Sequence, residues 1–541
     1  MSHSSEEASP KPTEAEGLSA VLGRNTVFSY LGRFWDLTVA LLLTPYVYHK
    51  LGDDLFGVWA LLATLTGYTA LVDLATGPAV TKYIAEAKAR DDAPGVQRLV
   101  STGLAVQGGL AVVIIGAAGL WADRALTWVQ VSPAAHAEAR TALLICVAVA
   151  GGARLFSVFN CVLEGVQRLD LTNGLRMVFG AAQAAGTLLV LHLGFGIVGL
   201  AYVSVAVWVV RGASLVALAR RNFPGLRPSL GSLSRGAVGQ LAGFTLKVQA
   251  ANISWLSMVN TDRLIVGAVL GPPKVALYEL GRRLVMGVHS GTAPIIAPLI
   301  PAASHLGAQE DAARLEHLFL RASRYVALLA AAGMGFLVAV GPQALRVWLG
   351  EVRAETLAVL NVLAVGYLAN MLTGPATGVG YGLGRPEFAM WRGFLLVVVQ
   401  IGLGLLLVRP LGVPGPAAAT TIALVCSSIL YVSLVSRRCL GLTSLASSLR
   451  AWLGPLVAGA VPAVVVFCLV QALERTGAFA GRGGAVGLVG VGFAAFLMLW
   501  GVIALGLGLV TREDRQLIRA ALGHIAAPRR ATELSASARG S

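Results

Sequence analysis

Ten ionisable side chains stand inside long apolar runs of the sequence, where a charge is costly unless it meets a partner, water or a ligand. They are Arg33, Asp36, Arg154, Arg211, Lys247, Asp262, Arg263, Glu279, Arg282 and Arg283. Two further carboxylates, Asp73 and Glu164, lie near the ends of predicted membrane helices. Most members of the set are cations, and guanidinium groups bind phosphate oxygens in pairs. The set therefore fits an anionic headgroup that must cross a medium of low dielectric constant.

The spacing of the acidic residues favours ion pairs on shared helical faces. Arg33 and Asp36 are three residues apart, which fits a local ion pair as well as a substrate contact. Glu279 precedes two arginines by three and four residues, and we expect it to pair with one of them and leave the other over. We treat Asp36, Asp73, Asp262 and Glu279 as candidates for ion coupling or for ion pairs.

Arg154 and Lys247 differ from the other cations, because neither has an acidic residue three or four positions away. Each needs a partner from another helix, water or a ligand. Asp262 and Arg263 are neighbours about 100° apart around a helix, so they face different surfaces. The predicted substrate-binding residues are Arg33, Arg154, Lys247, Arg282 and Arg283.

The elements that hold these charges are apolar stretches of membrane-spanning length. Of the 541 residues, 56% are hydrophobic and 13% are charged, against about 25% charged in a typical soluble domain. We predict an all-α polytopic membrane protein with about 14 transmembrane helices. The predicted spans are 25–48, 55–77, 99–121, 141–163, 174–193, 197–219, 239–270, 276–300, 325–345, 356–381, 390–408, 414–436, 452–472 and 486–510.

The distribution of Lys and Arg predicts the orientation of these helices. Both tails and the even-numbered loops carry most of the basic residues that lie outside the spans, and such loops face the cytoplasm. We expect both termini in the cytoplasm. The net charge of +15 is then a consequence of topology, and no nucleic-acid motif accompanies it.

The sequence contains an internal duplication. Leu51–Leu61 resembles Leu270–Leu280 and Asp92-Ala93 matches Asp311-Ala312, both at an offset of 219, while Gly165 and Arg168 match Gly382 and Arg385, and Gly196, Gly199 and Ala201 match Gly412, Gly415 and Ala417. The offset spans about six helices, so both copies face the same way, as in parallel-repeat transporters. The repeat also places two segments, 82–98 and 303–322, that we predict to be short interfacial helices on the cytoplasmic side.

The duplication predicts the following domains. They are a disordered cytoplasmic tail (1–18), an N-terminal six-helix bundle (19–222), a C-terminal six-helix bundle (236–440), two extra transmembrane helices (451–510) and a cytoplasmic tail (511–541). The sequence contains no Walker A motif, no H-E-x-x-H and no G-x-S-x-G, and its five cysteines have no metal-ligand spacing. We therefore predict no catalytic residues, no metal site and no cofactor.

At this level the chain resembles the polysaccharide-transporter (Wzx-type) flippases of the multidrug/oligosaccharidyl-lipid/polysaccharide (MOP) exporter superfamily. The residues that carry the resemblance are Asn25, Arg33, Pro45, Leu51-Gly52, Phe56-Gly57, Leu71-Val72-Asp73-Leu74-Ala75, Lys82-Tyr83-Ile84-Ala85, the turns Gly165–Arg168 and Gly382–Arg385, and the glycine-rich entries 194–201 and 412–419. The resemblance covers about residues 20–440, and the helix count extends it to about 510. These motifs specify the superfamily better than the substrate.

The resemblance implies two six-helix bundles that work by alternating access in the bacterial cytoplasmic (inner) membrane. It implies a lipid-linked oligosaccharide on undecaprenyl pyrophosphate as substrate, surface polysaccharide biosynthesis as the process, and H+ or Na+ coupling. It also implies membrane lipids, a polysaccharide polymerase and glycosyltransferases as partners. By analogy with cavity-facing cations on helices one, four, seven and eight, the corresponding residues are Arg33, Arg154, Lys247 and Arg282.

Other functions stay open. A lipid II flippase shares a cationic cavity and 14 helices. A multidrug antiporter of the same superfamily favours an acidic cavity and 12 helices, so the cation-rich spans weigh against it. A membrane glycan polymerase or ligase needs large outer loops, which are short here. A structural membrane partner with a degenerate site is a fourth interpretation. The sequence does not specify the sugar, the coupling ion or the oligomeric state.

Overall fold

The structure is a computed structural model that describes residues 12–72, 77–441, 446–479 and 481–510. Within these ranges the side chains of 12–31, 33, 71–72, 77–78, 230, 235, 240–254, 293–294 and 446–448 are left undescribed. Three of the predicted site residues, Arg33, Asp73 and Lys247, therefore lie outside the described residues or side chains. Their predicted roles stay predictions.

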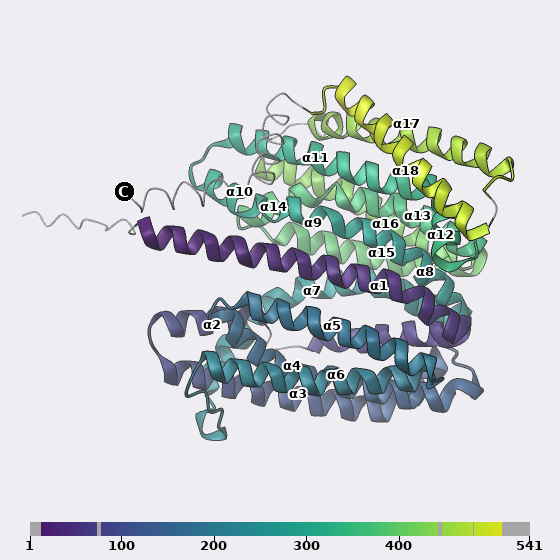
Figure 1. Ribbon diagram of the computed structural model, residues 1–541. Helices are drawn as coiled ribbons and strands as arrows, with labels where there is room; N and C mark the ends of the chain where they lie inside the picture. Colours follow the sequence, from purple (N-terminus) through teal and green to yellow (C-terminus); the bar gives the residue numbers. More distant parts are fainter. Residues whose placement is uncertain (1–11, 73–76, 442–445, 480, 511–541) are drawn as a thin grey trace, which may run out of the picture. The chain divides into compact units, whose positions relative to one another are not determined.

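Helices make up the described secondary structure (Figure 1). In chain order they are α1 (Pro12–Tyr68), η1 (Thr69–Val72), α2 (Gly77–Ala89), α3 (Ala93–Trp128), α4 (Pro133–Gly165), α5 (Leu169–His192), α6 (Gly196–Asn222), η2 (Leu230–Ser232), α7 (Arg235–Leu270), α8 (Pro272–His289), η3 (Ser290–Thr292), α9 (Ala293–Ile296), α10 (Leu299–Ala308), α11 (Ala312–Ala339), α12 (Gly341–Leu349), α13 (Ala354–Met371), α14 (Gly374–Gly382), α15 (Glu387–Leu411), α16 (Pro414–Cys439), α17 (Ala446–Arg475) and α18 (Gly481–Gly506). The all-α prediction is confirmed for this part of the chain.

Ten of the described helices are long and apolar enough to cross a membrane. The predicted total of 14 spans stays a prediction, because α1, α7 and α8, which carry many of the charges, are not among the ten. The prediction of one continuous helix over 276–300 is wrong. Helix α8 ends at His289, and the chain continues through η3 and the short α9. Pro294 and Pro298 follow in this stretch, and each removes a backbone N–H that a helix would need.

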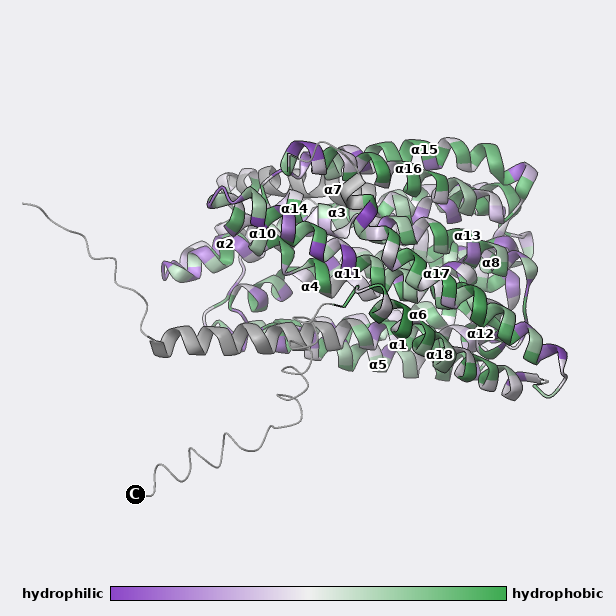
Figure 2. Cartoon of the chain, turned by 90° about the horizontal axis from the view of Figure 1, so that it is seen from above, coloured by the Kyte–Doolittle hydropathy of each residue, from purple (hydrophilic) through white to green (hydrophobic). Residues whose placement is uncertain are grey.

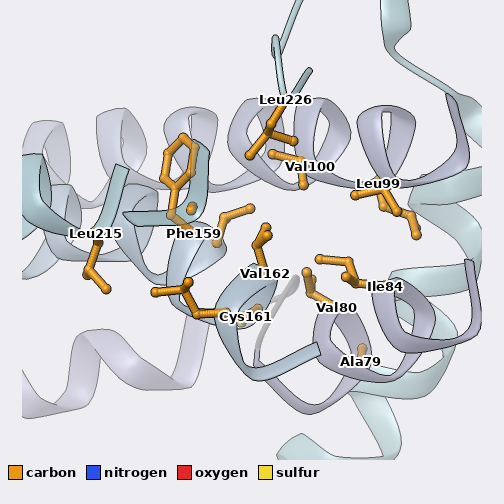
Figure 3. Close-up of a cluster of buried hydrophobic side chains, with 14 of the residues drawn as sticks. Ala79, Val80, Ile84, Leu99, Val100, Phe159, Cys161, Val162, Leu215 and Leu226 are labelled. Carbon is orange, nitrogen blue, oxygen red and sulfur yellow. The ribbon is translucent and has the colours of Figure 1, made fainter. Parts of the chain in front are cut away.

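The helices form two compact units, which we describe separately. The first unit contains residues 1–294, 352–369 and 385–431. In it, α3, α4 and α6 pack together with α2, and α5 packs on α6 and α1 (Figure 1). Figure 3 shows the core between α2, α3, α4 and α6, where Ile84, Val100 and Val162 point toward one another and Leu215 of α6 belongs to the same cluster. The predicted bundles 19–222 and 236–440 follow the internal duplication, whereas the compact units follow the packing of the helices. The two bundles therefore stay a prediction.

The second unit contains residues 295–351, 370–384 and 432–541. Its largest packing is between α11 and α17, where Gly335 and Gly459 let the two backbones approach. A Cβ on Gly459 would lie 2.6 Å from that of Ala331, so this position needs a glycine. At one end, Glu474 accepts hydrogen bonds from Gln343 (2.7 Å) and Arg346. The two helices after residue 446 are thus fixed to α11 and α12.

Apolar side chains cover the outside of several helices, as expected of a surface that faces lipid. Figure 2 shows α15 and α17 as largely hydrophobic. On α15 the exposed residues are Trp391, Phe394, Leu395, Val398, Ile401, Leu405, Leu406 and Leu411. A water-soluble protein rarely exposes so continuous an apolar face. This surface is that of a multi-pass membrane protein.

Backbone breaks recur at positions that the duplication matches. Gly52 has φ 71° and ψ 178°, and it interrupts α1; Gly271 has φ 83° and ψ 171°, and it separates α7 from α8. Only glycine adopts such a conformation without strain. Asp92 and Asp311 cap α3 and α11 in the same way, each accepting a hydrogen bond from the amide three residues later, at 2.8 Å and 3.0 Å.

The predicted interfacial segments differ from the observed elements. Residues 82–98 are divided between α2 and the first turns of α3. The separate interfacial helix predicted over 303–322 is wrong, because residues 312–322 are the first turns of the long helix α11. The buried Leu315 and Phe319 pack that helix into the protein, so the apolar face expected to lie on the bilayer is turned inward.

Candidate functional site

Glu279 is the centre of a buried ion cluster in the first unit. It lies on α8 and is 2% exposed. Its carboxylate accepts hydrogen bonds from Arg282 Nε at 2.9 Å and from Arg283 Nε at 2.8 Å. Arg263 of α7 adds a third cation, with 3.6 Å from its Nη1 to Glu279 Oε2. The expectation that one arginine is left over is therefore wrong, because the two carboxylate oxygens serve both.

The fold brings these residues together through the break between α7 and α8. Gly271 in the left-handed region and Pro272 at the start of α8 turn the chain sharply, so the end of α7 packs against the first turns of α8. On α8 the spacing of three and four residues then places both arginines over Glu279. Arg263 also donates to Asn260, one turn earlier on α7.

Asp262 faces away from this cluster toward α15 and α16, as its 100° separation from its neighbour predicts. It is 3% exposed and accepts hydrogen bonds from Tyr278, from Thr420 (2.7 Å) and from Gln400 (2.9 Å). Four helices, α7, α8, α15 and α16, thus meet at one carboxylate. Gln400 also donates to the carbonyl of Met258 at 3.1 Å. Its own side-chain oxygen is buried and lacks a hydrogen-bond partner among the described atoms.

Arg283 connects the cluster to the first helix. It donates to Thr44 of α1, and its guanidinium lies 5.8 Å from the centre of the Phe56 ring. Its side chain is 30% exposed, whereas those of Arg263 and Arg282 are 9% and 10% exposed. Arg283 is thus the member of the cluster that a ligand can reach most directly. Three arginines around one carboxylate give this cluster a formal charge of +2, and the neighbouring Asp262 lowers the sum to +1.

Arg154 occupies a separate place in the same unit, in the middle of α4. It is 8% exposed and donates to Thr69 of η1 at 3.1 Å. Its partner therefore comes from another element, as the sequence predicted. Nearly three turns further along α4, Glu164 accepts hydrogen bonds from Asn160 at 2.8 Å and from Thr81 of α2 at 3.2 Å. Glu164 is therefore a packing contact between helices.

Asp36 pairs with Arg176 of α5, with 3.6 Å from Nε to Oδ2. Both side chains are partly exposed, at 48% and 34%. The local pair that the sequence favoured for Asp36 involves Arg33, whose side chain lies outside the described part. The structure brings Asp262, Glu279, Arg282 and Arg283 together and places Arg154 and Asp36 apart from them.

Polar contacts also lie beside the break within α1 and at the first turns of α8 and α13. Asp53, directly after the break in α1, accepts a hydrogen bond from Tyr48 at 2.6 Å and lies 3.8 Å from Arg353. Lys274, after the break before α8, lies 2.7 Å from Glu355 at the start of α13. We call these two ion pairs, Asp53–Arg353 and Lys274–Glu355, the helix-end pairs. These pairs were not predicted from the sequence, although all four residues lie in or beside loops predicted to lie on one side of the membrane.

Three uncharged members of the site were also missed, namely Tyr278, Gln400 and Thr420. Polar side chains within apolar spans were the available signal, but long-range pairing decides which of them reach Asp262. Gln400 and Thr420 lie 138 and 158 residues away from it along the chain.

The comparisons with known proteins agree with this architecture. Residues 143–356 match the family model described as "Polysaccharide biosynthesis protein". The chain is 22% identical over 429 residues to the "Putative O-antigen transporter" of Shigella flexneri, a match that covers 77% of this chain and 98% of that protein.

Two solved structures share the fold. An inward-facing multidrug resistance MATE family transporter of the MOP superfamily matches with a TM-score of 0.67 and 19% identity, covering 75% of this chain and 96% of that one. The lipid II flippase MurJ in an inward closed conformation matches with a TM-score of 0.68 and 11% identity, covering 89% of this chain and 99% of that one. These comparisons confirm the resemblance drawn from the sequence: the chain resembles the Wzx-type polysaccharide transporters, and it has the fold of MOP superfamily transporters.

Proposed function

We propose that the protein is a flippase that moves a lipid-linked oligosaccharide, carried on undecaprenyl pyrophosphate, across the cytoplasmic membrane for surface polysaccharide biosynthesis. The observation that carries the proposal is the cation-rich interior of a chain with a transporter fold. The cluster around Glu279 keeps an excess of positive charge, and Arg283 is accessible to a ligand. A pyrophosphate is the part of such a substrate that most needs cationic partners inside a membrane.

The sequence relative supports this substrate class, because the Shigella flexneri protein is named as a transporter of O-antigen. The work of the protein is then translocation rather than bond chemistry. Membrane lipids surround it, and a polymerase and glycosyltransferases act before or after it on the same glycan. Arg33, Arg154, Lys247, Arg282 and Arg283 are the proposed contacts for the anionic headgroup.

The mechanism we propose is alternating access between two halves related by the internal repeat. The matched breaks at Gly52 and Gly271 and the matched caps at Asp92 and Asp311 support such a repeat. With both termini in the cytoplasm, the helix-end pairs lie at the outer surface. They join α1 and α8 of different halves to the start of α13, so they hold the outer end closed until the substrate arrives.

Asp262 is our candidate for the coupling ion. Its carboxylate is buried, and it accepts hydrogen bonds from the hydroxyl of Thr420 and the amide nitrogen of Gln400. A proton or a sodium ion bound there would neutralise the carboxylate and weaken the hydrogen bonds that hold α8, α15 and α16 around it. Binding of the ion would thereby change the packing of the second half, which is what coupling requires.

Two other transport functions are alternatives to this proposal. A lipid II flippase is favoured by the structural match to MurJ, which covers 89% of this chain. Lipid II also carries a pyrophosphate, so the cationic cluster suits it equally well. A multidrug antiporter is less compatible, because an organic cation would meet Arg283 and its neighbours.

The test is reconstitution of the purified protein in liposomes with three probes. A fluorescent undecaprenyl-pyrophosphate oligosaccharide, fluorescent lipid II and ethidium are compared in the same vesicles, with empty liposomes as the control. We expect rapid transbilayer movement of the oligosaccharide and none of ethidium. Movement of lipid II alone would replace the proposal by a peptidoglycan-precursor flippase, and movement of ethidium alone would replace it by a drug antiporter.

A further inference from the structure

A groove lies where α10 and the first turns of α11 meet, in the second compact unit. It has a volume of about 410 Å³ and is lined by Leu306, Ala313, Arg314, His317, Leu318 and Arg321. Its lining is largely apolar, and it includes the side chains of two arginines and a histidine. No step of the proposed transport uses it.

The basic residues of the lining form one stripe on α11. Arg314, His317 and Arg321 follow one another at spacings of three and four residues, and Arg324 continues the stripe three residues further on. Side chains at these spacings share one helical face. We call these four residues the α11 basic stripe. Leu315 and Phe319 on the opposite face of the helix are buried, so a ligand reaches α11 from the side of Arg314 and His317.

The members of the stripe differ in exposure: Arg314 and His317 are exposed, whereas Arg321 and Arg324 are half-buried. Arg314 lies 3.3 Å from Asp311, but its side chain is 76% exposed, and an exposed pair of this kind contributes little. Arg321 and Arg324 lie 6.0 Å and 5.3 Å from the centre of the Tyr325 ring, which orders both side chains along the helix.

The matched helix α3 shows that the fold does not require this stripe. At the offset of 219, the four positions are occupied by Gly95, Arg98, Thr102 and Ala105. Yet α3 begins with the same aspartate cap as α11, with nearly identical cap angles of φ −83° and −84°. A helix with this cap geometry therefore forms with a single basic residue on that face. The three additional basic residues of α11 are thus not required for folding.

The position of the stripe identifies its ligand. Directly after Tyr325 the helix continues as Val326–Ala339, an apolar stretch that belongs to one of the ten membrane-spanning candidates. The groove therefore lies at the level where the membrane interface begins. Basic side chains at the end of a membrane helix attract anionic headgroups, and a largely apolar lining fits the upper part of an acyl chain.

We propose that the α10–α11 groove, with Arg314, His317 and Arg321, binds the headgroup phosphate of an anionic membrane phospholipid. The proposal needs only that the chain is an integral membrane protein, so it holds whichever substrate is transported. The lipid acts as a ligand that fixes α10 against α11, and the protein is more resistant to unfolding when the lipid is bound.

The test uses the full-length protein and the variant R314Q/H317Q/R321Q. The matched control is K82Q/K88Q/R98Q, which removes three cations or potential cations from exposed positions on α2 and α3. Each protein is purified, exposed to phosphatidylglycerol or phosphatidylcholine and examined by native mass spectrometry. Thermal unfolding in lipid-free detergent verifies that both variants fold as the unaltered protein does.

We expect the unaltered protein and the control to retain phosphatidylglycerol in preference to phosphatidylcholine. The stripe variant should require at least a tenfold higher concentration of phosphatidylglycerol for equal occupancy, since each lost basic group near the surface weakens the attraction severalfold. Equal retention by the stripe variant and the control would overturn the proposal. So would full displacement of the phospholipid by free inorganic phosphate, which would identify a simple anion site.

Discussion

Two helices at matched positions of the repeat differ in the charge of their buried side chains. The part of α1 that follows Gly52 carries Ala60, Ala63 and Thr64 where α8, after Gly271, carries the acid and two arginines of the ion cluster. In α1 these positions carry no charge: Ala60 is 3% exposed, and Thr64 donates to the carbonyl one turn before it at 2.9 Å. In α8 the same positions hold a dense set of charges.

The backbone of these helices therefore does not require buried charges. A break at glycine followed by a membrane helix forms in both places, once with small residues and once with a buried ion network. Burying ions costs several kcal/mol each in desolvation, which their mutual attraction offsets only when the geometry is good. An ion network that the fold can do without, in a membrane interior, therefore points to transport.

The largest expected effect is loss of Glu279. In Glu279→Gln three guanidinium groups lose their shared carboxylate, and breaking a buried pair in this way costs about 3–5 kcal/mol. We expect little folded protein and a melting temperature well below that of the unaltered chain, measured by fluorescence-detected size exclusion after heating. Ala60→Gln at the matched position of α1 is a control for simple overpacking. A Glu279→Gln protein of normal thermal stability would show that the carboxylate does not hold the cluster.

The next effect concerns the accessible cation. Arg283→Gln removes the headgroup contact but leaves Glu279 paired with Arg263 and Arg282. We expect the protein to fold and the rate of oligosaccharide flipping in liposomes to fall at least tenfold, since a charge-assisted hydrogen bond contributes about 1.5–3 kcal/mol. Arg283→Lys should recover part of the rate. Unchanged flipping by Arg283→Gln would remove this residue from the substrate path.

A third variant tests whether ion coupling can be lost while substrate transport continues. Asp262→Asn keeps the size of the side chain and can still accept hydrogen bonds from Thr420, but it cannot bind a coupling cation as a carboxylate does. We expect flipping to continue at a reduced rate and to lose its dependence on an imposed proton or sodium gradient. The measurement compares rates with and without each gradient. A variant that still responds to the same gradient would place the coupling ion elsewhere.

The smallest effect is expected at the helix-end pairs, whose side chains are partly exposed. Asp53→Arg places two like charges together, and we expect transport to decline about two- to fivefold, in line with about 0.5–1 kcal/mol for an exposed pair. Adding Arg353→Asp should restore the rate by reversing the pair. The double variant is the decisive one: if it is as slow as the single variant, the pair does not hold the outer end.

Much of this arrangement could be predicted from the sequence, because membrane helices and intramembrane charges are local signals. Helical spacing predicted that Glu279 pairs with Arg282 or Arg283, but not that it pairs with both. The partners of Asp262 on α15 and α16 were not predicted, since they depend on how distant helices pack. The break after His289 was also missed, because hydropathy continues through it while the prolines interrupt the helix. The continuity of α11 was missed because its charged first turns were predicted as a separate interfacial helix.

The most direct test of the central claim compares two substrates that differ in charge alone. In liposomes, the flipping rate of an undecaprenyl-pyrophosphate oligosaccharide is measured against that of the same polyprenyl oligosaccharide joined through a neutral linker. We predict that the unaltered protein moves the pyrophosphate compound at least tenfold faster, and that Arg154→Gln combined with Arg283→Gln abolishes the preference. Equal rates for the two compounds in the unaltered protein would contradict the claim that the cationic interior carries the headgroup.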